Sequence, residues 1–157
     1  MTKQEFISKY HAAIQEACKG TPIFPSVTLA QAALETGWGK AAIDNNMFGV
    51  KATGNITPFW NGKGKLVDTH EVINGKSVVK KCSFRVYATT ADSVRDHNYL
   101  LLKLDRYKRV RDAKTPEEQC IMLQQCGYAT AKKYADTLIS IIKTNNLTKY
   151  DSRYVTS

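Results

Sequence analysis

The stretch that decides the fold is Leu29-Ala30-Gln31-Ala32-Ala33-Leu34-Glu35-Thr36-Gly37-Trp38-Gly39-Lys40, which places one carboxylate near the end of an otherwise uncharged, strongly helix-forming segment. Pro25 and Ser26 precede it, and a serine at that point can cap the free amides of a first helical turn. Gly37 is the residue type that most easily takes the left-handed conformation after a helix. We therefore predict a helix from about residue 25 to 36, with Glu35 in its last turn.

This position is electrostatically unfavourable for the Glu35 carboxylate. The C-terminal end of a helix carries partial negative charge, which disfavours a further negative charge by a few tenths to about 1 kcal/mol. If Trp38 and Phe48 help to exclude water, desolvation raises the pKa of the carboxyl group as well. A carboxyl group that keeps its proton near neutral pH is suited to general acid catalysis. The alternative is an ordinary surface glutamate, but the small apolar neighbours of Glu35 favour the catalytic interpretation.

The length and composition indicate one ordered domain with an anionic partner. A chain of 157 residues with 43% hydrophobic residues and four prolines fits a single globular core over residues 1–157. Its 23 Lys and Arg against 14 Asp and Glu give a net charge of +9. The partner predicted from that charge is nucleic acid, anionic lipid or an acidic cell-wall polymer.

The sequence contains no run of about 18 apolar residues, so we expect no membrane span. The amino-terminal residues carry both acidic and basic groups and lead into no apolar core of signal-peptide length. We expect either export by another route or a leader outside this sequence. The basic run from Arg106 to Arg111 has no interleaved aromatic platform and no helix-turn-helix pattern, so specific nucleic-acid binding is not expected.

The potential metal ligands do not form a recognisable set. The four cysteines fit neither a paired zinc site nor a dense disulfide framework, and we interpret them mostly as buried thiols, with disulfides left open; they are Cys18, Cys82, Cys120 and Cys126. His97 lacks partners at ligand spacing and is interpreted as structural or exposed. No metal and no cofactor is implied.

Two kinds of periodicity indicate an α+β organisation. Apolar residues at spacings of three and four predict a helix over residues 3–19. Between Trp60 and Tyr87 β-branched and aromatic residues dominate, and Asn74-Gly75 is a strong signal for a hairpin turn. We predict a small antiparallel sheet of two or three strands inserted between helical parts.

Helices return after the sheet. Thr89 and Thr115 stand at positions typical of N-caps, since each is followed three residues later by an acidic residue. A last helix is predicted over roughly residues 131–145. The polar tail, about 149–157, is expected to be less ordered.

An ordered loop is predicted over residues 44–52, directly after the Glu35 helix. The side chain of Asn46 offers donors and acceptors suited to hydroxyl and acetamido groups, and the ring of Phe48 can stack on the apolar face of a sugar. The alternative, in which the loop's Asn residues satisfy their own backbone, stays equally open.

Several motifs in order make the chain resemble the endo-β-N-acetylglucosaminidases of glycoside hydrolase family 73. The motifs are Pro25–Lys40, Asn45–Ala52, Phe84–Tyr87, Gly127–Thr130 and Tyr134-Ala135. The resemblance covers about residues 5–145. It implies a lysozyme-like α+β fold, with a mainly helical lobe and a small antiparallel β-hairpin lobe, about residues 60–87, flanking a cleft. After Thr130 the family commonly continues with Asp and Pro, whereas this chain has Ala131-Lys132-Lys133, a departure that leaves the local turn open.

The resemblance also implies an activity: hydrolysis of the β-1,4 bond between N-acetylglucosamine and N-acetylmuramic acid in peptidoglycan. Glu35 stands at the family's catalytic acid position, and Tyr128 is implied to line the sugar cleft. Together with Tyr128, the candidate substrate-binding residues are Trp38, Asn46, Phe48 and Tyr134.

A second catalytic group is expected, because glycosidases usually pair the acid with a base or a nucleophile. Glu71 is the candidate from the hairpin, and Asp68 is its competitor. A separation of roughly 6.5–9.5 Å between the carboxylates suits inversion, and about 5–5.5 Å suits retention. A third route, in which the substrate's acetamido group is the nucleophile, needs no close second carboxylate.

The alternatives within this interpretation are a muramidase or a lytic transglycosylase of the same superfold, and a non-catalytic module that binds cell-wall glycan. In each case the partner is the peptidoglycan glycan strand. We expect a monomer that acts at the bacterial cell wall, in the periplasm or outside the cell, as an autolysin, a phage lysin or a secreted effector.

Overall fold

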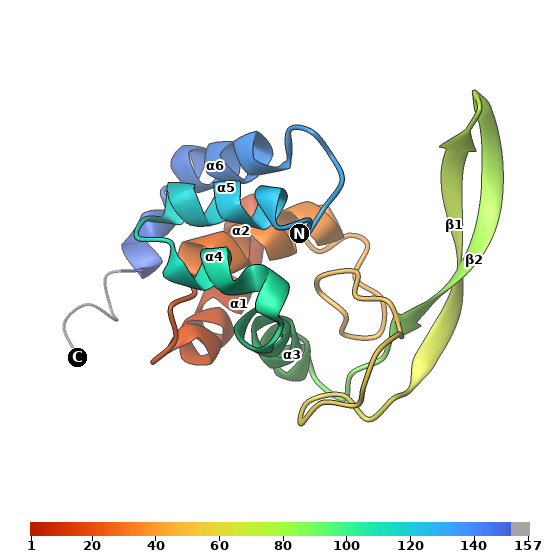
Figure 1. Ribbon diagram of the computed structural model, residues 1–157, viewed down its shortest axis with the longest axis horizontal. Helices are drawn as coiled ribbons and strands as arrows, with labels where there is room; N and C mark the ends of the chain where they lie inside the picture. Colours follow the sequence, from red (N-terminus) through yellow and green to blue (C-terminus); the bar gives the residue numbers. More distant parts are fainter. Residues whose placement is uncertain (152–157) are drawn as a thin grey trace.

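The helix that carries Glu35, α2 (Pro25–Thr36), is the most enclosed element of the fold. Ten of its 12 residues are buried. A helix that is apolar and small on nearly all sides needs neighbours all round. In the computed structural model, which describes residues 1–151, α2 packs against helices at both ends of the chain (Figure 1).

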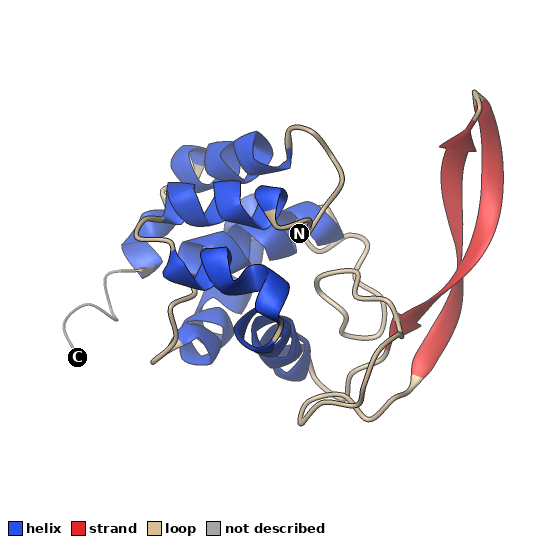
Figure 2. Cartoon of the chain, in the orientation of Figure 1, coloured by secondary structure: helices blue, strands red, loops and turns tan. Residues whose placement is uncertain are grey.

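These neighbours form a helical body with one long hairpin at its side (Figure 2). The elements besides α2 are α1 (Lys3–Cys18), β1 (Gly64–Ile73), β2 (Lys76–Arg85), α3 (Thr90–Lys103), η1 (Asp105–Tyr107), α4 (Lys108–Asp112), α5 (Pro116–Gln125), α6 (Tyr134–Thr144) and η2 (Leu147–Tyr150). The α+β class is confirmed.

The two ends of α2 are fixed by different means. Gly37 follows the helix in the left-handed conformation, at φ 56°, as predicted. The prediction for Ser26 is wrong, because Phe24 is the N-cap residue. Ser26 instead donates from its amide and its hydroxyl to the two carboxylate oxygens of Asp151, at 2.8 and 2.6 Å. The C-terminal segment therefore caps the central helix.

That contact also corrects the expectation of a loosely ordered tail from residue 149. Lys149 and Tyr150 belong to η2, and the Tyr150 carbonyl accepts a hydrogen bond from Gln15 at 3.1 Å. Residues 152–157, the remainder of the predicted tail, lie outside the described residues.

The hairpin has two strands in antiparallel register, with Ile73 opposite Lys76. Asn74 and Gly75 both take positive φ, 53° and 76°, as the predicted two-residue turn requires. Of the two or three strands predicted between residues 60 and 87, two are present, and beside them Lys51 forms an isolated bridge with Phe84.

The later helices follow the predicted caps, with two differences. The hydroxyls of Thr89 and Thr115 each accept from the backbone amide three residues on. The last helix begins at Tyr134, three residues later than predicted. The basic run 106–111 is also helical, in η1 and α4, because Tyr107 and Val110 are buried in the core.

All four cysteines are free thiols. Cys18 and Cys120 are buried as expected, and burial raises their pKa values to about 11 and about 12. Cys82 and Cys126 are half-buried. Within the described part of the chain, none of the helices combines the length and the apolar character that a membrane crossing needs.

Candidate active site

Glu35 lies at the end of α2 that points toward the loop preceding β1 and toward the hairpin (Figure 1). The residue is exposed, as a proton donor to an external substrate must be. Protein atoms nevertheless crowd its other sides, and this desolvation raises the pKa of the carboxyl group. Within residues 1–151 Glu35 has no ion pair or side-chain hydrogen bond that would offset the effect.

The loop comes close to the carboxylate at Gly49. A Cβ atom on residue 49 would lie 3.8 Å from Glu35 Oε2, and Gly49 has a φ of 62°. The absence of a side chain therefore leaves the carboxylate open on this side. The predicted neighbourhood of the loop and Glu35 is present in the structure.

A wall of aromatic side chains in ring contact runs from Phe48 to Tyr134. Phe48 stacks on His97 with ring centroids 3.9 Å apart, His97 meets Tyr128 edge-on at 5.7 Å, and Tyr128 stacks on Tyr134 at 5.8 Å. Burial raises the pKa of both tyrosines, and the nearby charge of Glu35 raises each further. Tyr128 and Tyr134 thus belong to the surroundings of the Glu35 carboxylate.

Gln31 ties this wall to the helix. It stands one turn before Glu35 on the same side of α2, and its side-chain amide donates to the Tyr134 hydroxyl at 3.0 Å. The Gln31 side-chain oxygen is buried without a partner.

The predicted sugar contacts Asn46 and Phe48 are both buried, at 4% exposure each. The Asn46 amide nitrogen donates to the carbonyls of Val50 and Arg85, at 2.9 and 3.0 Å. Its oxygen accepts from the amides of Phe48 and Val50. These bonds use the polar atoms of Asn46 to shape the loop, which favours the structural alternative for this residue.

Trp38 is half-buried on the side of α1. Its ring meets Phe6 edge-on at 5.6 Å, and the ammonium of Lys3 lies 5.2 Å from its centroid. Within residues 1–151 Trp38 and Phe48 make no ring contact with each other, although the sequence interpretation placed both around Glu35. Of the predicted aromatic contacts, Tyr128 combines nearness to Glu35 with partial exposure.

His97 lies in the core, at 2% exposure. Its Nδ1 is 2.8 Å from the side-chain oxygen of Asn98, and its Nε2 is buried without a partner. Burial lowers the pKa of His97 to about 4, so the ring is neutral near pH 7. This location agrees with a structural histidine.

Glu71 and Asp68 point to opposite faces of the hairpin, because side chains alternate along a strand. The face of Glu71 also carries Thr69, which is half-buried, and Lys65, whose ammonium is 3.1 Å from Asp44 in the loop after α2. Asp68 lies on the other face and pairs with Lys81 at 3.2 Å.

The structure does not bring Glu71 into contact with Glu35. Glu71 is exposed near the hairpin turn and pairs with Lys80 at 3.6 Å. The hairpin extends away from the helical body in Figure 1. A role for Glu71 in the reaction therefore requires the hairpin to move toward the body.

A buried ion pair anchors the base of this hairpin, and sequence reasoning missed it. Arg85, at the end of β2, donates to Asp96 of α3 at 2.8 Å, and both side chains are almost fully buried. Asp96 also accepts from Thr57 at 2.5 Å and from the Tyr87 hydroxyl. The Arg85 guanidinium lies 3.8 Å from the centroid of the Trp60 ring. Arg85 and Tyr87 stand in the motif quoted above, but no local signal names Asp96 as their partner.

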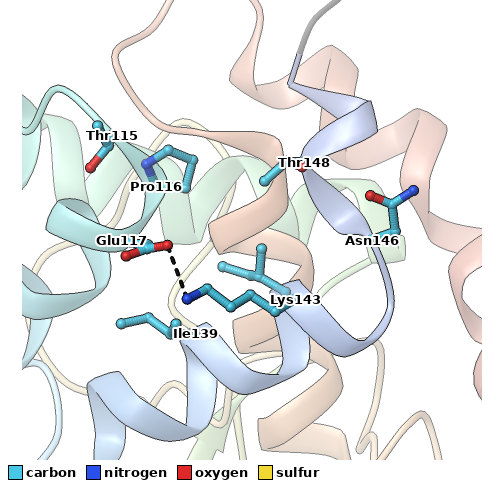
Figure 3. Close-up of a pocket in the computed structure, with 8 residues that line it drawn as sticks. Thr115, Pro116, Glu117, Ile139, Lys143, Asn146 and Thr148 are labelled. Carbon is cyan, nitrogen blue, oxygen red and sulfur yellow. Dashed lines mark ion pairs between the residues drawn. The ribbon is translucent and has the colours of Figure 1, made fainter.

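A distinct pocket lies elsewhere in the described residues. It has a volume of about 530 Å³ and is lined by the start of α5 and the end of α6, where Glu117 pairs with Lys143 at 3.4 Å (Figure 3). None of the predicted site residues lines it. This pocket therefore lies apart from the predicted site around Glu35.

A mainly helical body with a two-stranded β-hairpin lobe is the architecture of a lysozyme-like glycoside hydrolase domain. The model of the family described as mannosyl-glycoprotein endo-beta-N-acetylglucosaminidase matches residues 11–147. The chain belongs to this glucosaminidase family, glycoside hydrolase family 73.

Its relatives agree with that membership. The chain is 36% identical to the exo-glucosaminidase LytG of Bacillus subtilis and 35% identical to the peptidoglycan hydrolase FlgJ of Salmonella typhimurium, over 95% and 89% of its length. It spans 54% and 45% of these relatives, about half of each. The solved glycoside hydrolase domain of Salmonella typhimurium FlgJ matches with a TM-score of 0.76 and 34% identity, over 92% of this chain and 98% of that domain.

Proposed function

We propose that the chain hydrolyses the β-1,4 bond between N-acetylglucosamine and N-acetylmuramic acid in peptidoglycan, with Glu35 as the general acid. The observation that carries the proposal is the position of Glu35: exposed, without a cation, desolvated at a helix C-terminus and close to Tyr128 and Tyr134. The names of the relatives, a peptidoglycan hydrolase and a glucosaminidase, support this substrate class.

In this reaction protonated Glu35 gives its proton to the glycosidic oxygen as the bond to the anomeric carbon breaks. Water then adds to that carbon and loses a proton, so the products are two sugar ends, one of them reducing. Tyr128 stands where a half-buried ring can contact a sugar bound beside Glu35. Of the predicted substrate contacts it is the one that we place first.

For the second group we propose Glu71 rather than Asp68. Glu71 shares a strand face with Lys65, which contacts the loop after α2, whereas Asp68 lies on the opposite face. A hairpin that swings toward the body would present Glu71 to the anomeric carbon and keep Asp68 in solvent. The variants Glu71→Gln and Asp68→Asn form a matched pair that tests the choice.

The assay is the release of reducing ends from purified peptidoglycan, with product masses. We expect Glu35→Gln to lose at least about 10²-fold in kcat, the lower end of general acid contributions, while its circular dichroism and Tm stay at wild-type values. Full activity in this variant would sink the proposal. Products that end in N-acetylmuramic acid, or in its anhydro form, would show a muramidase or a transglycosylase instead. Binding without turnover by the wild type would show a glycan-binding module.

We further propose that the domain works as a monomer at the cell wall, outside the cytoplasm. The location is supported by the proposed substrate, peptidoglycan, which lies outside the cytoplasm. The monomeric state is supported by the position of Glu35, Tyr128 and Tyr134 in one chain. Sedimentation of the active protein at assay concentration tests the first part. An obligate dimer would contradict it.

A further inference from the structure

Four exposed cations lie on two segments that meet beside the Glu35 site. Arg106 and Arg109 come from η1 and α4, and Lys132 and Lys133 come from the loop between α5 and α6. We call these four residues the basic strip. Their role is not explained by the hydrolysis of a glycosidic bond, which needs no cation.

Hydrogen bonds join η1 and α4 to the end of α5 and to the loop that follows it. The Arg109 guanidinium donates to the side chain of Gln125 at 3.2 Å, and that of Arg106 reaches the carbonyl of Gly127 at 3.5 Å. On the other side of the same turn, Gln124 donates to the carbonyl of Lys132 at 2.9 Å. The two guanidinium groups are therefore positioned rather than freely rotating.

The strip adjoins the proposed substrate contact Tyr128. Arg106 lies 4.7 Å from the centroid of the Tyr107 ring, and Tyr107 lies 6.2 Å from Tyr128. Tyr128 in turn lies within the electrostatic reach of Glu35. An anion held by Arg106 would thus lie near a sugar bound at Tyr128.

The charge of the strip is not neutralised within the protein. Lys65, Lys80 and Lys81 each have a carboxylate within ion-pair distance. Within the described residues, none of the four cations of the strip has one. The carboxylates nearest along the chain are Asp105, Asp112 and Asp136, and Asp112 is paired with Lys108, so the strip keeps a net positive charge.

We propose that the basic strip binds the carboxylates of the peptides that the glycan strand carries, and so selects peptide-bearing strands. This inference rests on the function proposed above. Guanidinium groups match planar carboxylates in geometry, and the place of the strip beside Tyr128 favours an anion on the substrate itself over a separate phosphate polymer. Exposed charge pairs are individually weak, each contributing about 0.2–1 kcal/mol, so the four act as a set.

The test uses soluble peptidoglycan fragments freed of phosphate polymers, either untreated or with their carboxylates capped as neutral amides. The variant is K132E/K133E. Within the described residues the side chains of Lys132 and Lys133 make no hydrogen bond or ion pair, and the new negative charges suit the N-terminus of α6. R109E is the second variant. K19E is the control, because Lys19 follows α1 near the start of α2, at the opposite end from Glu35.

On the untreated fragments we expect K132E/K133E to raise KM about three- to tenfold at low salt, with kcat within about twofold of the wild type and K19E unchanged. On the capped fragments we expect the KM of the wild type to rise by the same factor. The KM of K132E/K133E should be the same on capped and on untreated fragments. The proposal is overturned if the KM of K132E/K133E exceeds that of the wild type by the same factor on both substrates. It is also overturned if the two proteins have the same KM on both substrates. An effect that appears only when phosphate polymers are left in place overturns it too. A wild type that releases no reducing ends from either substrate contradicts the proposed function instead.

Discussion

At the scale of single residues, Glu35 draws its chemistry from what surrounds it rather than from a partner. Desolvation raises the pKa of its carboxyl group, and no cation lowers it. A general acid must hold its proton, so activity is lost as the pH rises through that raised pKa. Gly49 leaves one side of Glu35 Oε2 open to water, because it has no side chain.

Gly49→Ala should therefore shift the pH profile. Its methyl group would lie 3.8 Å from Glu35 Oε2 and displace water, which raises the pKa and moves the basic limb of kcat to higher pH. The positive φ of Gly49 also makes the change destabilising, by about 1–2 kcal/mol. Gly75→Ala has the same φ problem, far from Glu35 in the hairpin turn, and is the control for strain. A basic limb that stays in place, or moves to lower pH, would contradict the expectation.

His97 gives the fold a predictable sensitivity to acid. Its pKa is lowered to about 4 in the folded state from an ordinary value of 6.5, so between these values the unfolded chain binds more protons. The stability that neutral His97 provides is fully present above pH 6.5 and is lost as the pH falls toward 4, amounting to about 3 kcal/mol. His97→Gln should flatten this slope in urea melts between pH 4 and 7. A slope equal to that of the wild type would refute the assignment.

At the scale of elements, the position of α2 depends on a contact across the whole chain. Asp151 accepts two hydrogen bonds from Ser26 at the start of α2, where a carboxylate also favours the helix dipole. Asp151→Ala should lower the free energy of unfolding by about 1–2 kcal/mol. Asp136→Ala, a change of an exposed aspartate in the first turn of α6, is the control. Chemical denaturation measures both, and equal losses would show that Asp151 has no special role.

The anchor between β2 and α3 should be costlier to break. Asp96→Asn leaves the buried Arg85 guanidinium without its counter-charge, and such a loss typically costs about 3–5 kcal/mol. Lys108 and Asp112 form an exposed pair, so Asp112→Asn should cost less than about 1 kcal/mol. Thermal unfolding compares the two variants. A similar small loss in both would mean that the buried pair contributes little.

These two contacts show where sequence reasoning ends. The turn at Asn74-Gly75, the caps at Thr89 and Thr115 and the stop at Gly37 were predictable because each signal lies within a few residues of the structure it makes. Asp151 is 125 positions from Ser26, and no sequence pattern near Asp151 predicts this contact. The sequence likewise suggested Asn46 for sugar binding. A side-chain amide can bind either a sugar or the backbone of its own loop, and the sequence does not show which partner lies near it.

At the scale of the whole molecule, the chain consists of a helical body and a hairpin that contacts it through its base. The contacts at the base include the pair of Lys65 with Asp44, the bridge between Lys51 and Phe84 and the anchor formed by Arg85. Farther out, the strands bond to each other, as Glu71 does with Lys80. Sequence periodicity predicted both parts, but not their mutual placement, because that depends on these few long-range contacts. We therefore expect the outer part of the hairpin to contribute to catalysis, through Glu71, and little to the stability of the fold.

Shortening the hairpin separates these two roles. In the shortened variant Asn-Gly replaces residues 68–81 and joins Val67 to Cys82. These two residues are opposite each other in the hairpin, as are Ile73 and Lys76 beside the present turn, and both pairs face the same side of the sheet. The base contacts are kept, so we expect cooperative unfolding with a Tm close to that of the wild type. Activity should fall at least about 10²-fold, because Glu71 is removed with the outer strands. Glu71→Gln is the matched point variant, and its loss should be of the same size. If the shortened domain stays folded and retains full turnover, the second group does not lie on the hairpin, and the acetamido group of the substrate becomes the nucleophile to test.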